Sequence, residues 1–262
     1  MKIYQVDAFT DTLFSGNPAA VCVMDAWLDD ELMQSIANEN NLAETAFVIP
    51  KGDDYEIRWF TPTVEVDLCG HATLASAFVL FNILDYPNPE IRFHSIRSGL
   101  LTVSKEDEKL FLDFPSDTLQ KVEGELVGFV EKCIGIKPKE LLKGKTDYIA
   151  IIENEEQLRE LSFDLREIVK LEARGLIVTS KGDSVDFVSR FFAPQAGVDE
   201  DPVTGSAHTS LIPIWYERLG KRNMKARQIS KRGGQLFCEF RDERCRIGGN
   251  ARLYLVGEIR ME

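Results

Sequence analysis

The chain has 262 residues, of which 44% are hydrophobic and 28% are charged, the composition of a soluble globular protein. Its formal net charge of −12 at pH 7 disfavours nucleic acid or an anionic membrane surface as a general partner. The basic segment Lys221–Arg232 is interpreted as solvated surface, because no aromatic residue is interleaved there for base stacking. Five cysteines without a CxxC pair indicate neither a zinc knuckle nor a disulfide framework.

The first half of the chain predicts strands around a buried helix. Its opening residues, MKIYQVDAFT, contain no long apolar run, so we expect no signal peptide and a cytoplasmic location. Asp29 or Asp30 can cap a helix that runs to about Asn40. Residues 72–84 form a second helix without charge, and polar residues in it favour a core helix over a membrane span. A helix that is apolar all round must be buried, and a curved sheet wrapped around it is the simplest container. The expected strands are Ile3–Phe9, the end of Phe14–Val23, Ala43–Pro50, Tyr55–Phe60, Ile91–Phe93, Leu100–Ser104 and Lys109–Asp113.

The second half predicts the same plan after a linker at Pro115–Gln120. A second buried helix is expected at Ser206–Tyr216, where Pro213 should bend it or mark a break. We therefore predict two domains, residues 1–115 and 121–250, with a strand at about 251–262 that returns to the first. The other expected elements are helices at Gly128–Cys133 and Glu155–Leu161 and strands at Tyr148–Ile152, Leu176–Thr179, Val185–Phe192, Gln235–Phe240, Arg244–Ile247 and Leu253–Ile259.

An internal repeat supports this division. Residues 47–71 resemble residues 177–206, and each copy ends at the start of a helix without charge. The spacing of roughly 130 residues is too long for a solenoid and indicates a duplicated domain. We expect a cleft between the two copies, with the chemistry in the residues that differ between them. The matching stretches are Lys51-Gly52-Asp53 with Lys181-Gly182-Asp183, and Arg58–Pro62 with Arg190–Pro194.

Both predicted helices begin at a glycine, in Cys69-Gly70-His71 and in Thr204-Gly205-Ser206. The N-terminus of a helix offers unpaired N–H donors and a partial positive charge, which together attract a carboxylate or phosphate. Glycine lets a ligand approach the backbone closely. The alternative is that each glycine only serves a tight turn. Because the two lie at matching places of the repeat, the interpretation as an anion site is favoured.

Glu44 is a candidate general base. It lies in the apolar strand NLAETAFVI, where strand alternation places it on one face with Leu42, Ala46 and Val48. Burial would raise the pKa of its carboxyl group toward neutrality and suit it to moving protons. The matching place in the second half falls near Arg174, so the two copies differ here. From the residues alone, a surface or cap role for this glutamate remains the alternative.

Asp201 and His71 are the other candidates for polar chemistry. Asp201 precedes the second helix in VDEDPVTGSAH, where it could also be part of an acidic turn fixed by Pro202. His71 follows the first glycine and could pass a proton to or from a substrate, or cap the helix. His208 is interpreted as a packed residue. Three scattered histidines do not form a metal site, so no metal or other cofactor is expected.

Several motifs in this sequence resemble the PhzF-like family, which is related to the isomerases of phenazine biosynthesis. They follow one another over the whole chain, and they are long and specific. The resemblance implies the diaminopimelate epimerase fold, an α+β architecture of two pseudo-symmetric domains, each a curved mixed or antiparallel sheet wrapped around a central helix. The motifs are GNPAAV (Gly16–Val21), NLAETAFV (Asn41–Val48), FTP to LCGHAT (Phe60–Thr73), DFP (Asp113–Pro115), DPVTGSAH (Asp201–His208) and GGN (Gly248–Asn250).

The resemblance also implies roles for particular residues. Glu44 stands in the place of the family's acid/base carboxylate, and Asp201, His71 and Ser206 match other polar residues of the site. Gly70 and Gly205 would serve as backbone donors, with Ala72 beside Gly70 at the substrate. The resemblance further implies a homodimer.

Related epimerases and racemases use two cysteines, one at each helix start. Here Cys69 stands at the first start, but Thr204 stands at the second, and threonine is far too weak an acid to replace a thiol. We therefore expect a cofactor-independent isomerase or epimerase in which Glu44 alone moves a proton on a small carboxylate. The alternatives are a racemase-like enzyme that uses Cys69 as one base, and a non-catalytic binding protein that keeps the fold.

Overall fold

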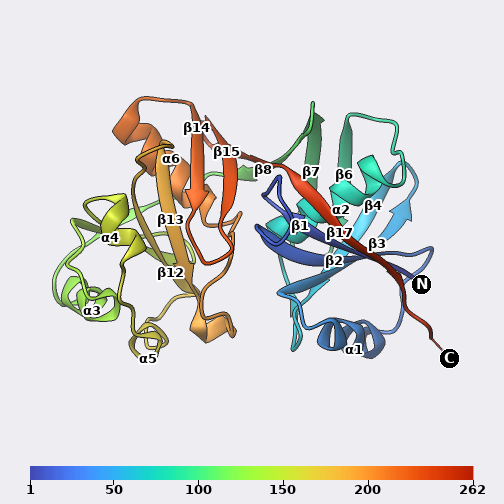
Figure 1. The fold of residues 1–262 in the computed structure, drawn as a ribbon, viewed down its shortest axis with the longest axis horizontal. Helices are drawn as coiled ribbons and strands as arrows, with labels where there is room; N and C mark the ends of the chain where they lie inside the picture. The colour runs from blue at the N-terminus through green and yellow to red at the C-terminus, as the bar shows by residue number, and fades with distance from the viewer. Residues whose placement is uncertain (262) are drawn as a thin grey trace. The chain divides into compact units, whose positions relative to one another are not determined.

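The computed structural model describes residues 1–261, and the chain divides into two compact units. Unit 1 contains Met1–Phe114 and the chain from Ile247 onward, and unit 2 contains Pro115–Arg246. Strands dominate both units, and a few helices accompany them (Figure 1). The predicted α+β class is therefore confirmed. None of the helices found within residues 1–261 has the length and apolar character to span a bilayer.

Unit 1 is built around a mixed sheet. Strand β3 pairs in parallel with β2 and antiparallel with β4, and β4 pairs in parallel with β6. The pairs β17–β1, β1–β2, β4–β5, β6–β7 and β7–β8 are antiparallel. The elements are β1 (Lys2–Ala8), β2 (Asn17–Val23), α1 (Asp30–Asn40), β3 (Glu44–Lys51), β4 (Asp54–Phe60), β5 (Glu65–Val66), α2 (Gly70–Asn82), β6 (Glu90–Ser95), β7 (Gly99–Glu106), β8 (Lys109–Pro115) and β17 (Ala251–Glu258).

Helix α2 is the central element of unit 1. It is buried at 11 of its 13 residues and packs against β1, β2, β3, β7 and β17 (Figure 1). A helix without charged side chains has no face that gains from contact with water, which is why strands surround it. It begins at Gly70, earlier than the predicted Ala72. Gly70 and His71 therefore lie in the first turn, where the backbone N–H groups have no partner within the helix.

Unit 2 repeats the strand pairing of unit 1. Strand β12 pairs in parallel with β11 and antiparallel with β13, and β13 pairs in parallel with β14. This repetition supports the proposal of a duplicated domain. The elements are β9 (Gln120–Val122), α3 (Glu125–Ile134), β10 (Glu140–Lys143), β11 (Asp147–Ile151), α4 (Glu155–Arg159), α5 (Leu165–Ile168), β12 (Gly175–Lys181), β13 (Phe187–Phe192), the 3-10 turn η1 (Pro194–Ala196), α6 (His208–Leu219), β14 (Asn223–Gln228), β15 (Gly234–Arg241) and β16 (Arg244–Gly249), whose last residues belong to unit 1.

Helix α6 runs unbroken through Pro213, so the predicted possibility of a break there is wrong. Proline lacks the N–H that would bond to the carbonyl oxygen of Thr209, four residues earlier. The backbone N–H of Asp117 donates to that oxygen instead, at 3.1 Å. The helix begins at His208 rather than at the predicted Ser206, because Gly205, Ser206 and Ala207 form tighter turns with bonds from residue i+3 to residue i.

The arginine of each repeat makes the same kind of contact. Arg58 on β4 binds both carboxylate oxygens of Glu65, at 2.7 and 2.9 Å, and its guanidinium lies 5.1 Å from the Phe60 ring. Arg190 on β13 binds both oxygens of Glu200, at 2.7 and 3.0 Å, and lies 5.2 Å from the ring of Phe192. Each carboxylate belongs to the segment that leads from the hairpin to the buried helix. The repeated arginine therefore anchors this segment in each unit.

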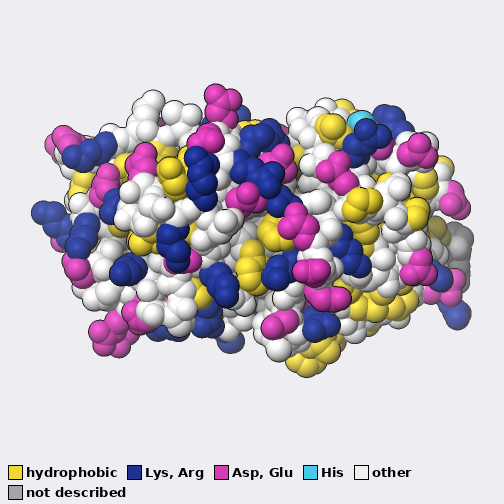
Figure 2. Space-filling model, turned by 90° about the horizontal axis from the view of Figure 1, so that it is seen from above, with side chains coloured by type: hydrophobic (Ala, Val, Ile, Leu, Met, Phe, Trp, Pro, Cys, Tyr) yellow, Lys and Arg dark blue, Asp and Glu magenta, His cyan; other side chains and the backbone are white. Residues whose placement is uncertain are grey.

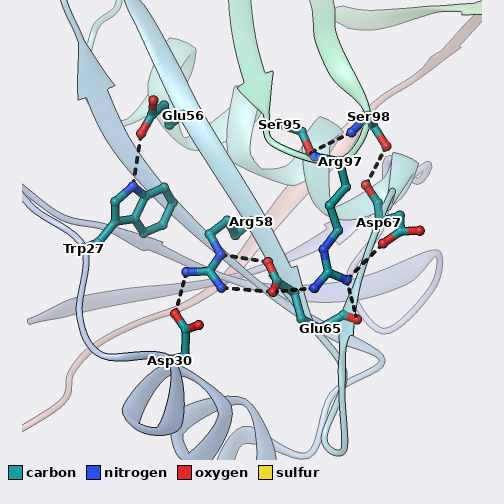
Figure 3. Close-up of polar contacts among 9 residues, drawn as sticks. All are labelled: Trp27, Asp30, Glu56, Arg58, Glu65, Asp67, Ser95, Arg97 and Ser98. Carbon is teal, nitrogen blue, oxygen red and sulfur yellow. Dashed lines mark hydrogen bonds and ion pairs between the residues drawn. The ribbon is translucent and has the colours of Figure 1, made fainter.

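In unit 1 the anchor extends into the network drawn in Figure 3. Arg97 donates to Glu65 at 3.1 Å and to Asp67 at 2.9 Å, while Asp30 accepts from Arg58 at 2.8 Å. These bonds hold the residues just before Cys69 and Gly70 against β4 and the turn after β6. The start of α2 is thus positioned by charge pairs as well as by packing.

The surface carries charges of both signs. Figure 2 shows acidic and basic side chains interspersed over the face that it draws. In the basic segment, Lys221 pairs with Asp186, and Arg222 pairs with Asp242 at 3.1 Å. These two bases are neutralised by acidic neighbours, as expected for a solvated surface.

Candidate functional site

Glu44 is the first residue of β3 in unit 1. It stands opposite Ala19 of the parallel strand β2, and its side chain is 19% exposed. The residues that follow it on β3, from Thr45 to Val48, are buried. The carboxylate therefore lies at the edge of the core, where it is largely shielded and still reachable.

His71, in the first turn of α2, lies beside this carboxylate. Its Nε2 atom is 3.1 Å from Oε2 of Glu44, an ion-pair distance, although neither atom has a hydrogen bond of good geometry. On the other side of the ring, Nδ1 lies 3.2 Å from Nδ2 of Asn17 and 3.5 Å from Sγ of Cys69. The structure thus brings Glu44, His71 and Cys69 together.

The groups around the His71 ring shift its pKa. Burial disfavours the charged ring, but the Glu44 carboxylate beside it favours that form, and the pKa of His71 is raised well above its usual value of 6.5. In the protonated ring both nitrogens carry hydrogen. In a neutral ring that accepts from Asn17 at Nδ1, the proton is on Nε2. In either form Nε2 carries a hydrogen, and it lies 3.1 Å from Oε2 of Glu44.

Asn17 contacts His71, and its residue type and neighbours did not mark it as a candidate. It is fully buried at the start of β2, and its amide reaches His71 across 54 positions of sequence. Gly16 makes this placement possible with a φ of +68°, and a Cβ there would lie 2.2 Å from the carbonyl oxygen of Ala8. Asn17 is part of the motif GNPAAV, which was used above only as evidence of the family resemblance.

Cys69 is buried, and burial together with the charge of Glu44 raises the pKa of its thiol to about 11. Compared with a free thiol near 8.5, this shift reduces the thiolate fraction at neutral pH by about 10² to 10³. We expect iodoacetamide at pH 7.5 to label Cys69 in the folded protein at least about 100-fold more slowly than in guanidinium. Peptide mapping by mass spectrometry measures both rates. Equal rates would contradict the raised pKa.

In unit 2, Asp201 caps the turn before α6. Its carboxylate accepts a hydrogen bond from the Thr204 hydroxyl. Gln228, which is almost fully buried on β14, donates to the Asp201 carbonyl oxygen at 2.7 Å and accepts from the Thr204 backbone N–H at 2.9 Å. The sequence argument missed Gln228, because nothing in its local pattern marks it. Together these bonds fix the backbone just before Gly205.

Ser206 and His208 have separate partners. The Ser206 hydroxyl oxygen accepts a hydrogen bond from Nη1 of Arg174 at 2.9 Å. The His208 ring is fully buried and packs 5.8 Å from the ring of Phe187, and its Nδ1–H donates to the carbonyl oxygen of Thr204 at 2.9 Å. Burial lowers the pKa of His208 to about 4, so the ring is neutral at pH 7. It is the packed residue that the sequence predicted.

Strand register identifies the residue of unit 2 that corresponds to Glu44. Phe47 stands opposite Arg58 in the first hairpin, and Val178 stands opposite Arg190 in the second. Counting back three residues from each leads to Glu44 and to Gly175. A Cβ at Gly175 would lie 2.6 Å from the ring of Phe191. The second unit therefore has no room for a carboxylate at this position.

We expect Gly175→Ala to lower the free energy of unfolding by about 1–3 kcal/mol, the usual range for overpacking in a close-packed core. Urea unfolding followed by circular dichroism measures the change. Gly128→Ala is the matched control, because a Cβ at Gly128 would meet nothing within 4 Å and alanine favours a helix. A loss at Gly175 no larger than that at Gly128 would contradict the predicted overlap.

The predicted site residues thus form three local groups. Glu44 and His71 are in contact next to Gly70 and Ala72 at the start of α2, Asp201 binds Thr204, and Ser206 follows Gly205 and binds Arg174. The ligand atoms of Glu44, Cys69 and His71 lie within 4.8 Å of one another, close enough to hold a metal ion. The expected absence of a cofactor and the shared cleft stay predictions.

Comparisons with known proteins identify the family to which the chain belongs. The family model for phenazine biosynthesis-like proteins (PhzC-PhzF) matches residues 6–257. A protein of Pseudomonas aeruginosa named as an uncharacterized isomerase is 52% identical over 261 residues, covering 100% of this chain and 99% of its own length. The crystal structure of a PhzF family protein from Enterococcus faecalis is 45% identical with a TM-score of 0.96, over 99% of both chains.

A structure with lower sequence identity shares the same fold. A protein of Pseudomonas aeruginosa described as a predicted epimerase is 20% identical with a TM-score of 0.74, over 100% of this chain and 99% of its own. At this identity the likeness concerns the fold alone. The family match and the closer relatives each span nearly the whole chain, and the chain therefore belongs to the phenazine biosynthesis-like family of PhzC and PhzF.

Proposed function

We propose that the protein is a cofactor-independent isomerase that moves a proton on a small carboxylate substrate, with Glu44 as its single acid/base residue. The observation that carries this proposal is the contact between Glu44 and His71 at the start of α2. A base must lie close to the reacting carbon and must be ionised when substrate binds. The Glu44 side chain is 19% exposed, and Nε2 of His71 lies 3.1 Å from its Oε2 atom.

In the proposed reaction, Glu44 removes a proton from a carbon next to a carboxylate or conjugated group. The same side chain then delivers the proton to another atom of the same molecule. His71 stabilises Glu44 as a carboxylate before proton removal and remains within reach of its oxygen after it. Residues at the helix starts (Gly70, Ala72, Gly205, Ser206) bind the acid group and the developing negative charge, and Asp201 orients the substrate.

Two features support a single base rather than a pair. The position that corresponds to Glu44 in unit 2 is Gly175, which cannot carry a side chain without overlap. Thr204 stands where related two-cysteine enzymes have a second thiol, and its hydroxyl already donates to Asp201. No second group of suitable acidity stands at either position. A shuttle by one carboxylate accounts for this asymmetry.

The alternative of a racemase-like enzyme that uses Cys69 is less well supported. A base must be deprotonated, and the pKa of this thiol is raised to about 11. Turnover that survives alkylation of Cys69 would exclude it. A binding protein without catalysis is the second alternative, which requires that no carboxylate exchange hydrogen in the presence of the protein. The expected homodimer and cytoplasmic location stay predictions.

The test is entry of solvent deuterium into carbon-bound positions of a panel of carboxylates. The panel contains amino acids, cyclic amino carboxylates and unsaturated dicarboxylates, and proton NMR or mass spectrometry detects the exchange. We expect exchange in at least one compound with the wild-type protein and none with heat-denatured protein. A panel that stays unlabelled throughout would argue for the binding protein.

A further inference from the structure

One contact in unit 2 occupies the place of the Glu44–His71 contact in unit 1. Gly70 and Gly205 are the matching helix-start glycines of the repeat, so His71 corresponds to Ser206. Glu44 corresponds by strand register to Gly175, and Arg174 is the residue before it. Glu44 lies 3.1 Å from His71, and Arg174 lies 2.9 Å from Ser206. In each unit a charged side chain at the start of a hairpin strand meets the residue after the helix-start glycine.

Arg174 is itself held rigidly. Its Nε atom donates to Oδ1 of Asp147 at 2.9 Å, and Nη2 donates to Oδ2 of the same carboxylate. The Asp147 side chain is 3% exposed and also accepts from the Thr146 hydroxyl at 3.0 Å. The guanidinium lies 5.2 Å from the ring of Phe191. A planar guanidinium bound at two atoms has a fixed direction for its remaining N–H groups.

That direction determines the role of the Ser206 hydroxyl. A guanidinium can only donate, so the Ser206 oxygen must accept from Arg174. The hydroxyl proton of Ser206 is then left to donate elsewhere, and none of residues 1–261 accepts it. Ser206 is partly exposed just before α6. Its proton is available to an anion from solvent.

We propose that Arg174 is a positioning residue of the substrate site, which fixes Ser206 as a one-way hydrogen-bond donor to the carboxylate of the substrate. This inference rests on the proposed function and adds a residue to it. The Ser206 oxygen accepts a hydrogen bond from a positively charged group, and this bond polarises the hydroxyl. The positive charge of Arg174 therefore makes the Ser206 hydroxyl a stronger hydrogen-bond donor.

The experiment measures the binding of benzoate, a small carboxylate, and of benzamide, its uncharged analogue, by ligand-observed NMR. We expect Ser206→Ala and Arg174→Gln each to weaken benzoate binding about tenfold, the usual effect of losing a hydrogen bond to a charged group. Benzamide binding should change less than about twofold, since it offers no negative charge to the hydroxyl. Arg222→Gln is the matched control, because this exposed arginine of unit 2 pairs with Asp242 and should leave both affinities unchanged.

The double variant Ser206→Ala/Arg174→Gln separates positioning from direct contact. If Arg174 acts through Ser206, the double variant binds benzoate as weakly as Ser206→Ala alone. Additive losses would overturn the proposal, as would a wild-type protein that binds benzoate no better than benzamide. Removing Arg174 leaves the buried Asp147 carboxylate without its arginine partner. Arg174→Gln/Asp147→Asn, which removes both charges, is therefore measured as well, and circular dichroism checks that each variant folds. Ser206→Ala and Arg174→Gln could weaken benzoate binding as expected while Glu44→Gln still exchanges deuterium at the wild-type rate. That result would reject Glu44 as the base and leave Arg174 supported as a positioning residue.

Discussion

Glu44→Gln is expected to reduce deuterium exchange into the active carboxylate by about 10²–10⁴-fold, the usual contribution of a general base. Glutamine keeps the size of the side chain and its place at the start of β3, but its amide cannot accept a proton at neutral pH. The His71 N–H still has an oxygen to face, so the fold should be retained. The rate of exchange at saturating substrate is the quantity to compare, because the loss falls on the chemical step.

Glu90→Gln is the matched control for this variant. Glu90 is also the first residue of a strand of unit 1, but its side chain is exposed. The Glu90→Gln protein should therefore catalyse deuterium exchange at the wild-type rate. Equal exchange by wild type and Glu44→Gln would reject Glu44 as the base. A loss in kcat/KM without a loss in kcat would assign Glu44 to substrate binding instead.

Arg58→Gln is expected to lower the free energy of unfolding by about 2 kcal/mol. The side chains of Arg58 and Glu65 are 13% and 18% exposed, so the pair lies between a surface ion pair, worth about 0–1 kcal/mol, and a buried one, where removing a partner costs about 3–5 kcal/mol. The variant also loses the contacts of the guanidinium with Asp30 and the rings of Trp27 and Phe60. Urea unfolding at several salt concentrations measures the change and its screening.

Arg92→Gln provides the comparison. Arg92 pairs with Asp54 at 2.7 Å in the same unit, but its side chain is 52% exposed, so its loss should cost less than about 1 kcal/mol. If the free energy of unfolding falls by a similar amount in the two variants, the network around Arg58 adds no stability beyond that of an exposed ion pair. Amide hydrogen exchange gives a second readout. It should increase in Arg58→Gln within residues 61–70, the segment held by the network in Figure 3, and should not increase there in Arg92→Gln.

Local patterns allowed much of the fold to be predicted. The absence of charge in residues 72–84 predicted a buried helix, since no side chain there gains from solvent, and α2 is buried on all sides. The extent of α6 could not be predicted from local pattern. A proline favours a break in isolation, but a carbonyl that loses its helical partner can be satisfied by a distant donor, here the N–H of Asp117.

Some residues of the candidate site could also be predicted from the sequence, and others could not. Glu44 and His71 were predicted from motifs, because an acidic residue in an apolar strand and a histidine after a helix-start glycine are visible in the sequence. Asn17 and Gln228 were missed. Each is a buried amide whose importance lies in a partner more than 20 residues away, His71 for Asn17 and Thr204 for Gln228. Side-chain amides of this kind have no periodic or local signature.

The sequence by itself determined which residue types are available: one glutamate in an apolar strand, a glycine at or just before each of two buried helices, and an arginine repeated in both halves. It could do so because hydrophobic periodicity and glycine positions depend on neighbours along the chain. The tertiary structure decided which of these residues touch. Contacts such as Glu44–His71 and Arg174–Ser206 depend on strand register and helix packing, and both are settled only when the whole core closes.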